Sequence, residues 1–396
     1  MKIAVLGHGT VGSGVAEILL DRKEEVSFAA GKEIELGAVL DIKDFPDLPY
    51  SDKFVSDFEK ILSDPEIKIV AEAMGGIEPA FTYVKSALES GKSVVTSNKE
   101  LVAEKGAELL SIARAQNVNF LFEASVGGGI PLIRPLYSAM NASGITEIAG
   151  ILNGTTNYIL TKMFRFGESY ESALADAQNL GYAERDPSAD VLGWDACRKI
   201  AILSSLVWGN TLRTDEIPTE GITNITSDDV SLAEQCGFSI KLLARAKRLE
   251  KGKIFAKVSP ALIKNDSPLS TVNDVFNAVL VRAQTTGDVL FYGKGAGKMP
   301  TASAVVADII ECAKTENNIK NVFWKDGAQS ISANRDSVKE RYFIRTSADV
   351  SSLLPGAEIL AGNAYLTPAL TESEISVLEQ KINEHAILLS KIPLFE

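Results

Sequence analysis

The chain has 396 residues, 45% of them hydrophobic and 23% charged, a composition typical of a folded protein with two or three domains. Its net charge of −12 argues against a nucleic-acid backbone or an anionic membrane as the main partner, because both would repel it. No apolar run approaches the roughly 18 residues of a membrane span, and no charged leader precedes the first apolar segment. We therefore expect neither membrane insertion nor secretion.

The cysteines and histidines limit the kinds of catalytic and metal sites that the chain can form. Cys197, Cys236 and Cys312 are far apart without CxxC spacing, so they predict no disulfide framework and no thiolate zinc site, and they fit a reducing cytoplasm. The two histidines, His8 and His385, match neither a Ser-His-Asp triad nor an HExxH zinc site. We interpret His8 as a residue tolerated in a glycine turn. If the chain is an enzyme, lysine or carboxylate groups are expected to carry its acid–base chemistry.

The N-terminal segment predicts a dinucleotide site. An apolar strand at 2–6 leads directly into GHGTVG and then into apolar residues at helical spacing. Glycines in this strand–turn–helix setting let the backbone approach a pyrophosphate at a helix N-terminus. The residues expected at the cofactor are Gly7, Gly9, Thr10, Val11 and Gly12.

A second strand, at 34–40, ends in Asp41, an acidic residue placed to accept hydrogen bonds from the ribose of NAD. Lys43 would instead suit the 2′-phosphate of NADP, and a plain turn at the end of the strand is a further interpretation. The cofactor preference is therefore open at this point.

Strands at 67–73 and 93–96 alternate with helices, which predicts a parallel, doubly wound sheet with ligands at the carboxyl ends of its strands. Ser97 and Lys99 lie at such an end, where Lys99 faces either a ligand or solvent. A fifth strand, at 119–123, precedes a glycine triplet whose carbonyls would hold a hard cation together with Glu123, unless the triplet is only a tight turn between domains.

A different pattern follows from about residue 147. A strand at 148–152 precedes NGTTN, which begins a helix and offers hydroxyl and amide groups to a small polar ligand or merely caps the helix. Strands at 254–258, 277–282 and 289–292 predict a mixed sheet with helices on one face, as in an α+β domain. A glycine-rich loop at 293–300 is no Walker A motif because Met299 replaces the hydroxyl residue, but it either approaches the cofactor or is a flexible helix start. Residues 342–346 and 374–382 predict a small terminal strand–helix module.

The segment 181–199 concentrates charge around a predicted helix start. Asp195 and Lys199 are four residues apart and share a helix face, either as an ordinary ion pair or as a partly buried lysine suited to proton transfer. A helix beginning just after Asp190 would leave that carboxylate able to turn toward the lysine, and Asp186 is expected to be a cap or turn residue.

Six motifs in order give the chain a resemblance to homoserine dehydrogenases over about residues 1–315. They are GHGTVG, SNKELVA, EASVGGGIP, GILNGTTNYI, GYAERDPSADVLGWDACRK and GKGAGKMPTASAV. The resemblance implies hydride transfer between NAD or NADP and carbon 4 of L-aspartate 4-semialdehyde, giving L-homoserine, in threonine and methionine biosynthesis. It also implies a Rossmann-type doubly wound domain at 1–130, a catalytic and dimerisation α+β domain at 131–315 and a short module at 316–396 that would correspond to a degenerate ACT-like domain.

By position, the resemblance implies Lys199 as the proton donor, with Lys99 and Asp195 also at the reacting centre. The residues expected at the substrate are Glu184, Asp190, Asp195 and Thr155, and those added at the cofactor are Asp41, Ser97, Lys99, Gly181 and Gly297. A sodium ion, as in the family, would be bound by Glu123, Val126, Gly128 and Ile130. The family suggests a homodimer, whereas the tail lacks the Pro-Gly-Val-Leu pattern of a threonine-binding ACT domain.

Two other functions fit part of the pattern. Aspartate-semialdehyde dehydrogenase would need a nucleophilic cysteine with a histidine partner, and Cys197 has no histidine nearby in sequence. A non-enzymatic NAD sensor would keep the glycine loop but would not need Lys99, Asp195 and Lys199 together.

Overall fold

The computed structural model describes residues 1–316, 322–327 and 329–396, which form two compact units. Unit 1 comprises Met1–Gly144, Ala201–Thr214 and Gly293–Ser330, and unit 2 comprises Ile145–Ile200, Asp215–Tyr292 and Ile331–Glu396. The boundaries expected after residues 130 and 315 divide the chain into consecutive domains, whereas each observed unit consists of three separate segments of the chain. One reason is that the helix at 298–314, late in the chain, packs against the first helix of unit 1.

Unit 1 is built on a parallel six-stranded sheet of order β3-β2-β1-β4-β5-β6. Its strands are β1 (Lys2–Leu6), β2 (Glu35–Leu40), β3 (Phe54–Val55), β4 (Ile67–Glu72), β5 (Ser93–Thr96) and β6 (Phe120–Leu121). This order is that of the dinucleotide-binding doubly wound fold. Residues Ile3 to Leu6 are fully buried, as expected for a central strand covered on both faces. The predicted Rossmann-type sheet is confirmed.

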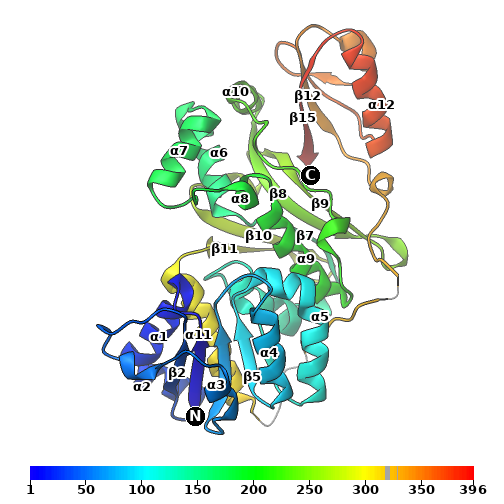
Figure 1. Ribbon diagram of the computed structural model, residues 1–396. Coiled ribbons are helices and arrows are strands. Elements are labelled where there is room, and N and C mark those ends of the chain that lie inside the picture. Colours follow the sequence, from blue (N-terminus) through cyan, green and yellow to red (C-terminus); the bar gives the residue numbers. More distant parts are fainter. Residues whose placement is uncertain (317–321, 328) are drawn as a thin grey trace. The chain divides into compact units, whose positions relative to one another are not determined.

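Helices cover both faces of this sheet (Figure 1). They are α1 (Thr10–Asp21), α2 (Lys23–Ala30), α3 (Glu59–Ser63), α4 (Ala80–Glu89), α5 (Lys99–Ala115) and α11 (Lys298–Lys314). Helix α11 packs against α1, α2, β4 and β5, whereas α4 packs against β4, β5 and α5. The amino end of α11 thus lies beside the helix that follows the glycine loop.

Unit 2 is built on a nine-stranded sheet of order β11-β10-β7-β8-β9-β15-β12-β14-β13. Its strands are β7 (Ile145–Ile151), β8 (Phe238–Arg248), β9 (Ile254–Lys264), β10 (Phe276–Ala283), β11 (Gly287–Lys294), β12 (Tyr342–Thr346), β13 (Glu358–Ile359), β14 (Ala364–Leu366) and β15 (Leu388–Phe395). Strand β7 pairs antiparallel with β10 and β8, β8 with β9, β12 with β15 and β14, and β13 with β14, whereas β15 runs parallel to β9. The predicted mixed sheet is confirmed.

The helices of unit 2 include α6 (Gly154–Phe166), α7 (Tyr170–Asn179), α8 (Ser188–Val191), α9 (Trp194–Trp208) and α10 (Ser227–Gln235). Helix α6 packs on β8 and β10, and α10 packs on β8 and α6. The boundary between the units falls within α9, after Ile200. The first turns of α9, which carry Asp195 and Lys199, belong to unit 2.

The C-terminal module contains more than the predicted strand and helix. Helix α12 (Glu372–Asn383) joins β14 to β15, and β12 lies between β14 and β15 with antiparallel pairing on both sides. The order of elements is that of a ferredoxin-like unit whose first helix is reduced to the single turn Ser351–Leu353.

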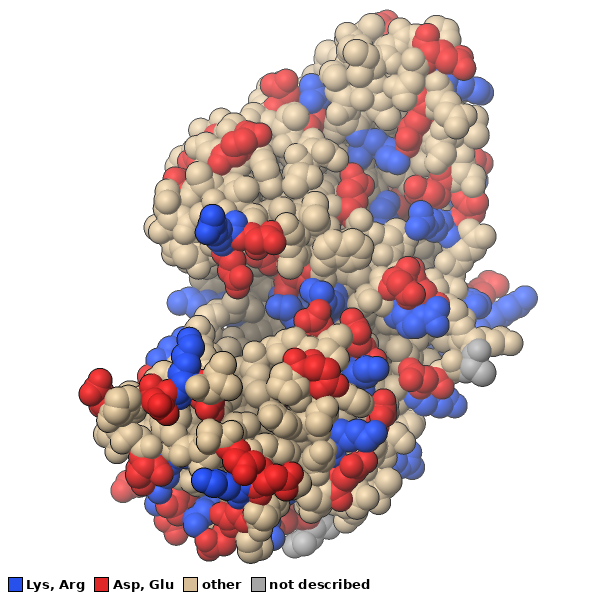
Figure 2. All heavy atoms as spheres, viewed as in Figure 1, with Lys and Arg blue, Asp and Glu red and all other residues tan. Residues whose placement is uncertain are grey.

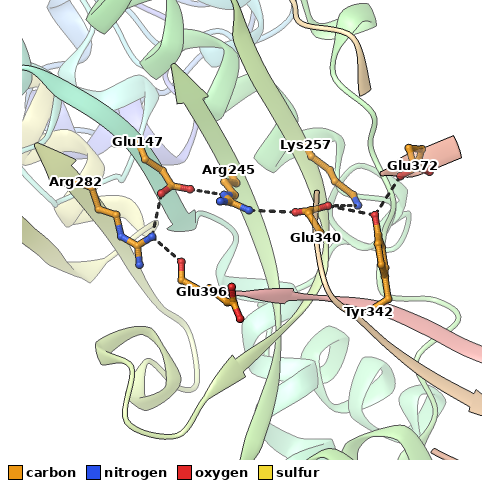
Figure 3. Close-up of polar contacts among 8 residues, drawn as sticks. All are labelled: Glu147, Arg245, Lys257, Arg282, Glu340, Tyr342, Glu372 and Glu396. Carbon is orange, nitrogen blue, oxygen red and sulfur yellow. Dashed lines mark hydrogen bonds and ion pairs between the residues drawn. The ribbon is translucent and has the colours of Figure 1, made fainter. Parts of the chain in front are cut away.

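A network of charged side chains links this module to the rest of the unit 2 sheet (Figure 3). Glu147 pairs with Arg245 and with Arg282, whose Nη1 lies 3.0 Å from Oε2 of Glu147. Arg245 also contacts Glu340 at 3.1 Å, and Glu340 contacts Lys257 at 3.3 Å. Glu340 lies two residues before β12. Its two interactions with opposite charges therefore connect the module to strands β7 to β10.

Among the described residues, none of the helices combines the length and the apolar character needed to cross a membrane. Figure 2 shows acidic and basic side chains interspersed on the face in view.

Candidate active site

The glycine loop of unit 1 places a helix N-terminus at the carboxyl end of β1. Helix α1 begins at Thr10 and Gly9 is its N-cap, while Gly7 has φ +89°, a backbone conformation that favours glycine. A Cβ at Gly12 would lie 1.8 Å from the carbonyl oxygen of Gly7, so only glycine permits this helix-to-strand approach. Gly9 and Thr10 are exposed, which leaves the first turn of α1 open to an anion.

Asp41 lies directly beside this loop. Its Oδ2 accepts the backbone N–H of His8 at 2.6 Å, and its Oδ1 accepts that of Lys43 at 2.9 Å. The structure thus places the carboxylate at the end of β2 next to the glycine turn, where an acidic residue of a dinucleotide-binding fold meets the ribose.

His8 is packed more firmly than a residue merely tolerated in a turn. Its ring lies edge-on to Phe45 and Phe54, and its Nε2 is 3.0 Å from the hydroxyl of Tyr50. Burial lowers the pKa of His8, so the ring is held in its neutral form. No sequence pattern indicated these contacts, because the partners lie in the loop that follows β2 and in β3.

Ser97 and Lys99 follow β5, at the same edge of the sheet as the glycine loop. Lys99 is the first residue of α5, and the side-chain oxygen of Asn98 caps the helix by accepting the N–H of Leu101 at 3.1 Å. Lys99 is half-buried, as is Ser97.

In the segment after β6, the side chain of Glu123 contacts backbone amide groups. Its carboxylate accepts the backbone N–H groups of Leu132, Ile133 and Arg134 at 2.6, 2.7 and 2.8 Å. Within residues 1–316, 322–327 and 329–396, no group of three or more His, Cys, Asp or Glu side chains is placed to hold a metal. These three N–H groups satisfy the buried carboxylate.

The glycine triplet after Glu123 allows a close approach of two loops in unit 1. A Cβ at Gly128 would lie 2.5 Å from the carbonyl oxygen of Gly295, and the N–H of Gly129 donates to Lys294. Gly297, with φ +121°, is the N-cap of α11. In unit 2, Gly181 has φ +74° and is exposed just after α7.

The polar centre of unit 2 is a buried cluster around Lys199. Its ammonium group donates to the carbonyl oxygen of Leu152 at 2.6 Å and to Oδ2 of Asp195 at 2.7 Å. Asn153 donates from its Nδ2 to Asp195 Oδ2 at 2.9 Å and to Asp190 Oδ1 at 2.7 Å. Lys199, Asp195 and Asn153 are 8%, 4% and 6% exposed, so the Lys199–Asp195 contact is a buried pair and not a solvated surface one.

This cluster depends on a break between two helices. Asp190 lies in the single turn of α8, and Gly193, with φ +87°, precedes α9 at Trp194. The expectation that the lysine-bearing helix begins after Asp190 is confirmed, although the separate turn of α8 was not predicted. Asp186 accepts the N–H and the hydroxyl of Ser188, in agreement with its predicted turn role.

The other two expected substrate residues differ: the hydroxyl of Thr155 interacts with Asp190 of this cluster, whereas Glu184 lies outside it. Glu184 is exposed, and in the described part of the chain its carboxylate makes no hydrogen bond or ion pair with the cluster. Thr155 donates its hydroxyl to the carbonyl oxygen of Tyr182 at 2.7 Å. Conversely, the sequence-based selection omitted Asn153 and Leu152, although the NGTTN motif contains the first of them.

Charge and burial give the two aspartates different properties. Burial, together with the nearby charge of Asp195, raises the pKa of Asp190, while the hydrogen bond from Asn153 opposes the shift. Asp190 is half-buried, so it is less enclosed than Asp195, which holds the lysine. The arrangement places a cationic group that can donate a proton, Lys199, near a carboxylate that can bind an ammonium group, Asp190.

Cys197 does not have the properties of a nucleophile. It is fully buried in α9, and burial raises the pKa of its thiol, the opposite of the change that activates a catalytic cysteine. This argues against the chemistry of aspartate-semialdehyde dehydrogenase.

A doubly wound dinucleotide fold together with a buried lysine–carboxylate cluster defines the class as a nicotinamide-dependent oxidoreductase. Two family models match the chain: homoserine dehydrogenase, NAD binding domain, over residues 7–123, and homoserine dehydrogenase over residues 131–310. A homoserine dehydrogenase of Lactococcus lactis is 40% identical over 398 residues, which cover 97% of this chain and 90% of that protein.

Solved structures agree with these relatives. A homoserine dehydrogenase from Thiobacillus denitrificans has a TM-score of 0.91 and 33% identity, covering 100% of this chain and 98% of the other. A hyperthermophilic archaeal homoserine dehydrogenase in complex with NADPH has a TM-score of 0.67 and 30% identity, covering 78% of this chain and 97% of the other. The chain belongs to the homoserine dehydrogenase family. The predicted NAD(P)-dependent interconversion of L-aspartate 4-semialdehyde and L-homoserine is confirmed.

Proposed function

We propose that Lys199 exchanges the proton with the oxygen on carbon 4 of the substrate, and that Asp195 holds the lysine in place for this step. The contacts of Lys199 with Leu152 and Asp195 carry the proposal, because they anchor two of the three N–H groups of an ammonium. The third can donate to the carbonyl oxygen as it gains negative charge during reduction of the semialdehyde.

Asp190 is proposed to bind the ammonium group of the amino-acid substrate. Its half-exposed carboxylate is oriented by Asn153, whose side chain also contacts Asp195 and so ties the binding group to the lysine. Glu184 and Thr155 complete the proposed substrate set. Because Glu184 is exposed, it would act at the outer side of the site.

The nicotinamide, when bound, would supply the hydride to carbon 4 of the substrate or accept it from that carbon. The glycine loop of residues 7–12 is proposed to hold the pyrophosphate and Asp41 the adenosine ribose, with Ser97, Lys99, Gly181 and Gly297 as further contacts. Asp41 supports NAD and Lys43 supports NADP, so an assay with each cofactor decides the preference.

A sodium ion is proposed at the carbonyl groups of Val126, Gly128 and Ile130. The fit of Glu123 as a fourth ligand is weakened by the three N–H groups that its carboxylate already accepts. A homodimer and a place in threonine and methionine biosynthesis are proposed from the family. The three free cysteines support a reducing, cytoplasmic location.

The test is the oxidation of L-homoserine by the purified protein with NAD and with NADP. Lys199→Ala is expected to lower kcat by about 10²–10⁴-fold, the range of general acid–base catalysis, while cofactor binding measured by fluorescence persists. Lys162→Ala, which removes a lysine of α6 paired with Glu168, serves as the control and should retain activity. Full activity of Lys199→Ala would overturn the role assigned to Lys199.

A further inference from the structure

Glu72 is a buried carboxyl group that the proposed mechanism does not use. It ends β4, is 0% exposed and lies at the ligand-binding edge of the unit 1 sheet. Its Oε1 accepts the backbone N–H groups of Met74 and Gly75 at 2.8 and 3.3 Å, and its Oε2 accepts the hydroxyl of Thr96 at 2.5 Å. Burial of a carboxyl group costs free energy, so the contacts that it makes here must compensate.

These contacts belong to a closed circuit of hydrogen bonds between two loops. The hydroxyl of Thr96, at the end of β5, also accepts the N–H of Asn98 at 2.9 Å. Asn98 in turn donates from its Nδ2 to the carbonyl oxygen of Gly76 at 2.6 Å. Glu72 is therefore connected to Gly76 by two routes, through the Met74–Gly75 turn and through Thr96 and Asn98.

This network of hydrogen bonds includes the residue that directly precedes Lys99. Asn98 is 6% exposed, is held by the contacts just described and caps α5, whose first residue is Lys99. The adjacent parallel strands β4 and β5 end at the edge where ligands of doubly wound sheets bind. A polar network that is buried and fully paired fixes one backbone arrangement, so the path of the chain at Lys99 depends on Glu72.

We propose that Glu72 is a positioning residue that holds Lys99 in its working geometry through Thr96 and Asn98. The inference rests on the proposed role of Lys99 at the reacting centre. A residue that acts through Lys99 should lose its influence on catalysis when the Lys99 side chain is absent, whereas a residue that merely stabilises unit 1 should not.

The experiment is a double-mutant cycle between Thr96→Val and Lys99→Ala. Thr96→Val removes the hydroxyl that joins Glu72 to Asn98 and nearly preserves the side-chain shape. We expect it to lower kcat by about 10-fold in the otherwise unchanged enzyme and by less than about 2-fold in the Lys99→Ala background. Glu72→Leu should lower kcat as well. Glu72→Gln, which can still pair with Thr96 and accept an N–H, should retain most of the wild-type kcat.

Thr315→Val is the matched control. It removes a buried hydroxyl of unit 1 that contacts Asn119, next to the amino end of β6 and so at the opposite edge of the sheet. It should lower the Tm to a similar extent and leave kcat unchanged.

Equal losses of kcat from Thr96→Val in both backgrounds would overturn the inference, as would an equal loss from Thr315→Val. Full activity of the single variant Lys99→Ala would show separately that the proposed role of Lys99 has failed, and the inference would fall with it.

Discussion

At the scale of single residues, the active-site cluster is distinguished by two neighbouring aspartates with different surroundings. Asp195 is buried against Lys199, whereas Asp190 is half-buried and accepts a hydrogen bond from the amide of Asn153. The same residue type therefore performs two proposed tasks, orientation of a lysine and binding of an ammonium group.

A pH dependence follows from the raised pKa of Asp190. As the pH falls, Asp190 takes up a proton at a higher pH than an ordinary aspartate, and a neutral carboxyl binds the substrate ammonium less well. We expect kcat/KM for L-homoserine to decline on this acid limb through a rise in KM. Asp190→Asn should have a lower kcat/KM and lack the limb, whereas Asp186→Asn, in the exposed turn, should retain it. An unchanged acid limb in Asp190→Asn would exclude this assignment.

At the scale of elements, helix α1 separates glycines that the fold requires from glycines that the ligand requires. A Cβ at Gly12 would collide with the carbonyl oxygen of Gly7, whereas a Cβ at Gly9 has no protein atom within 4 Å. Gly12 therefore serves the packing of α1, whereas the open space at Gly9 fits the proposed approach of the pyrophosphate.

We expect Gly12→Ala to destabilise the protein by about 1–3 kcal/mol, because α1 must move away from β1. Gly9→Ala should leave the free energy of unfolding within about 0.5 kcal/mol of the wild-type value, because Gly9 has φ −77° and open space around it. It should nevertheless weaken cofactor binding, since the methyl group would occupy the approach of the pyrophosphate. Urea unfolding and fluorescence titration distinguish the two effects, and unchanged cofactor affinity in Gly9→Ala would contradict the site.

Strand β8 shows where prediction from sequence failed at this scale. It is central to the unit 2 sheet, but Lys241 and Arg245 interrupt its apolar pattern. Both charges are accommodated by partners distant in sequence, Lys241 by the carbonyl oxygen of Val272 at 2.6 Å and Arg245 by Glu147 and Glu340. Burial lowers the pKa of Lys241 to about 7, which illustrates the cost of placing a lysine there.

At the scale of the whole molecule, the C-terminal module is continuous with the catalytic sheet of unit 2. Strand β15 pairs with β12 of the module and, at Leu394 and Phe395, with β9. Glu340 adds a partly buried charge between Arg245 and Lys257, as Figure 3 shows. The module is thus held by both backbone pairing and side-chain charges.

Glu340→Ala is expected to destabilise the protein by about 3 kcal/mol, because it leaves Lys257 and one side of Arg245 without their shared partner. The side chain of Glu340 is 9% exposed, so solvent cannot replace it fully. Chemical denaturation followed by fluorescence and circular dichroism measures the loss. Lys339→Ala, which removes an exposed ion pair with Glu374, should have little effect. Equal effects of the two variants would show that the network contributes no more than a surface pair.

The sequence by itself determined the dinucleotide fold, the order of the elements around it and the residue types of the site. Glycine spacing, strand–helix alternation and the pairing of Asp195 with Lys199 are local patterns, and local patterns can be read along the chain. The small terminal module was predicted only as a strand and a helix. Strands β13 and β14, of two and three residues, are too short to give a pattern, and the eight-residue β15 was missed.

Only the tertiary structure decided which polar groups meet. Asn153 and the carbonyl of Leu152 lie between β7 and α6, 37 to 47 positions from the residues they contact. Glu72 meets Thr96, and Glu123 meets the amides of residues 132–134. A buried carboxylate can be compensated by a cation, by amides or by a hydroxyl, and the sequence around it is compatible with each. The choice among them depends on which segments pack together, so it is determined by the packing of the whole unit.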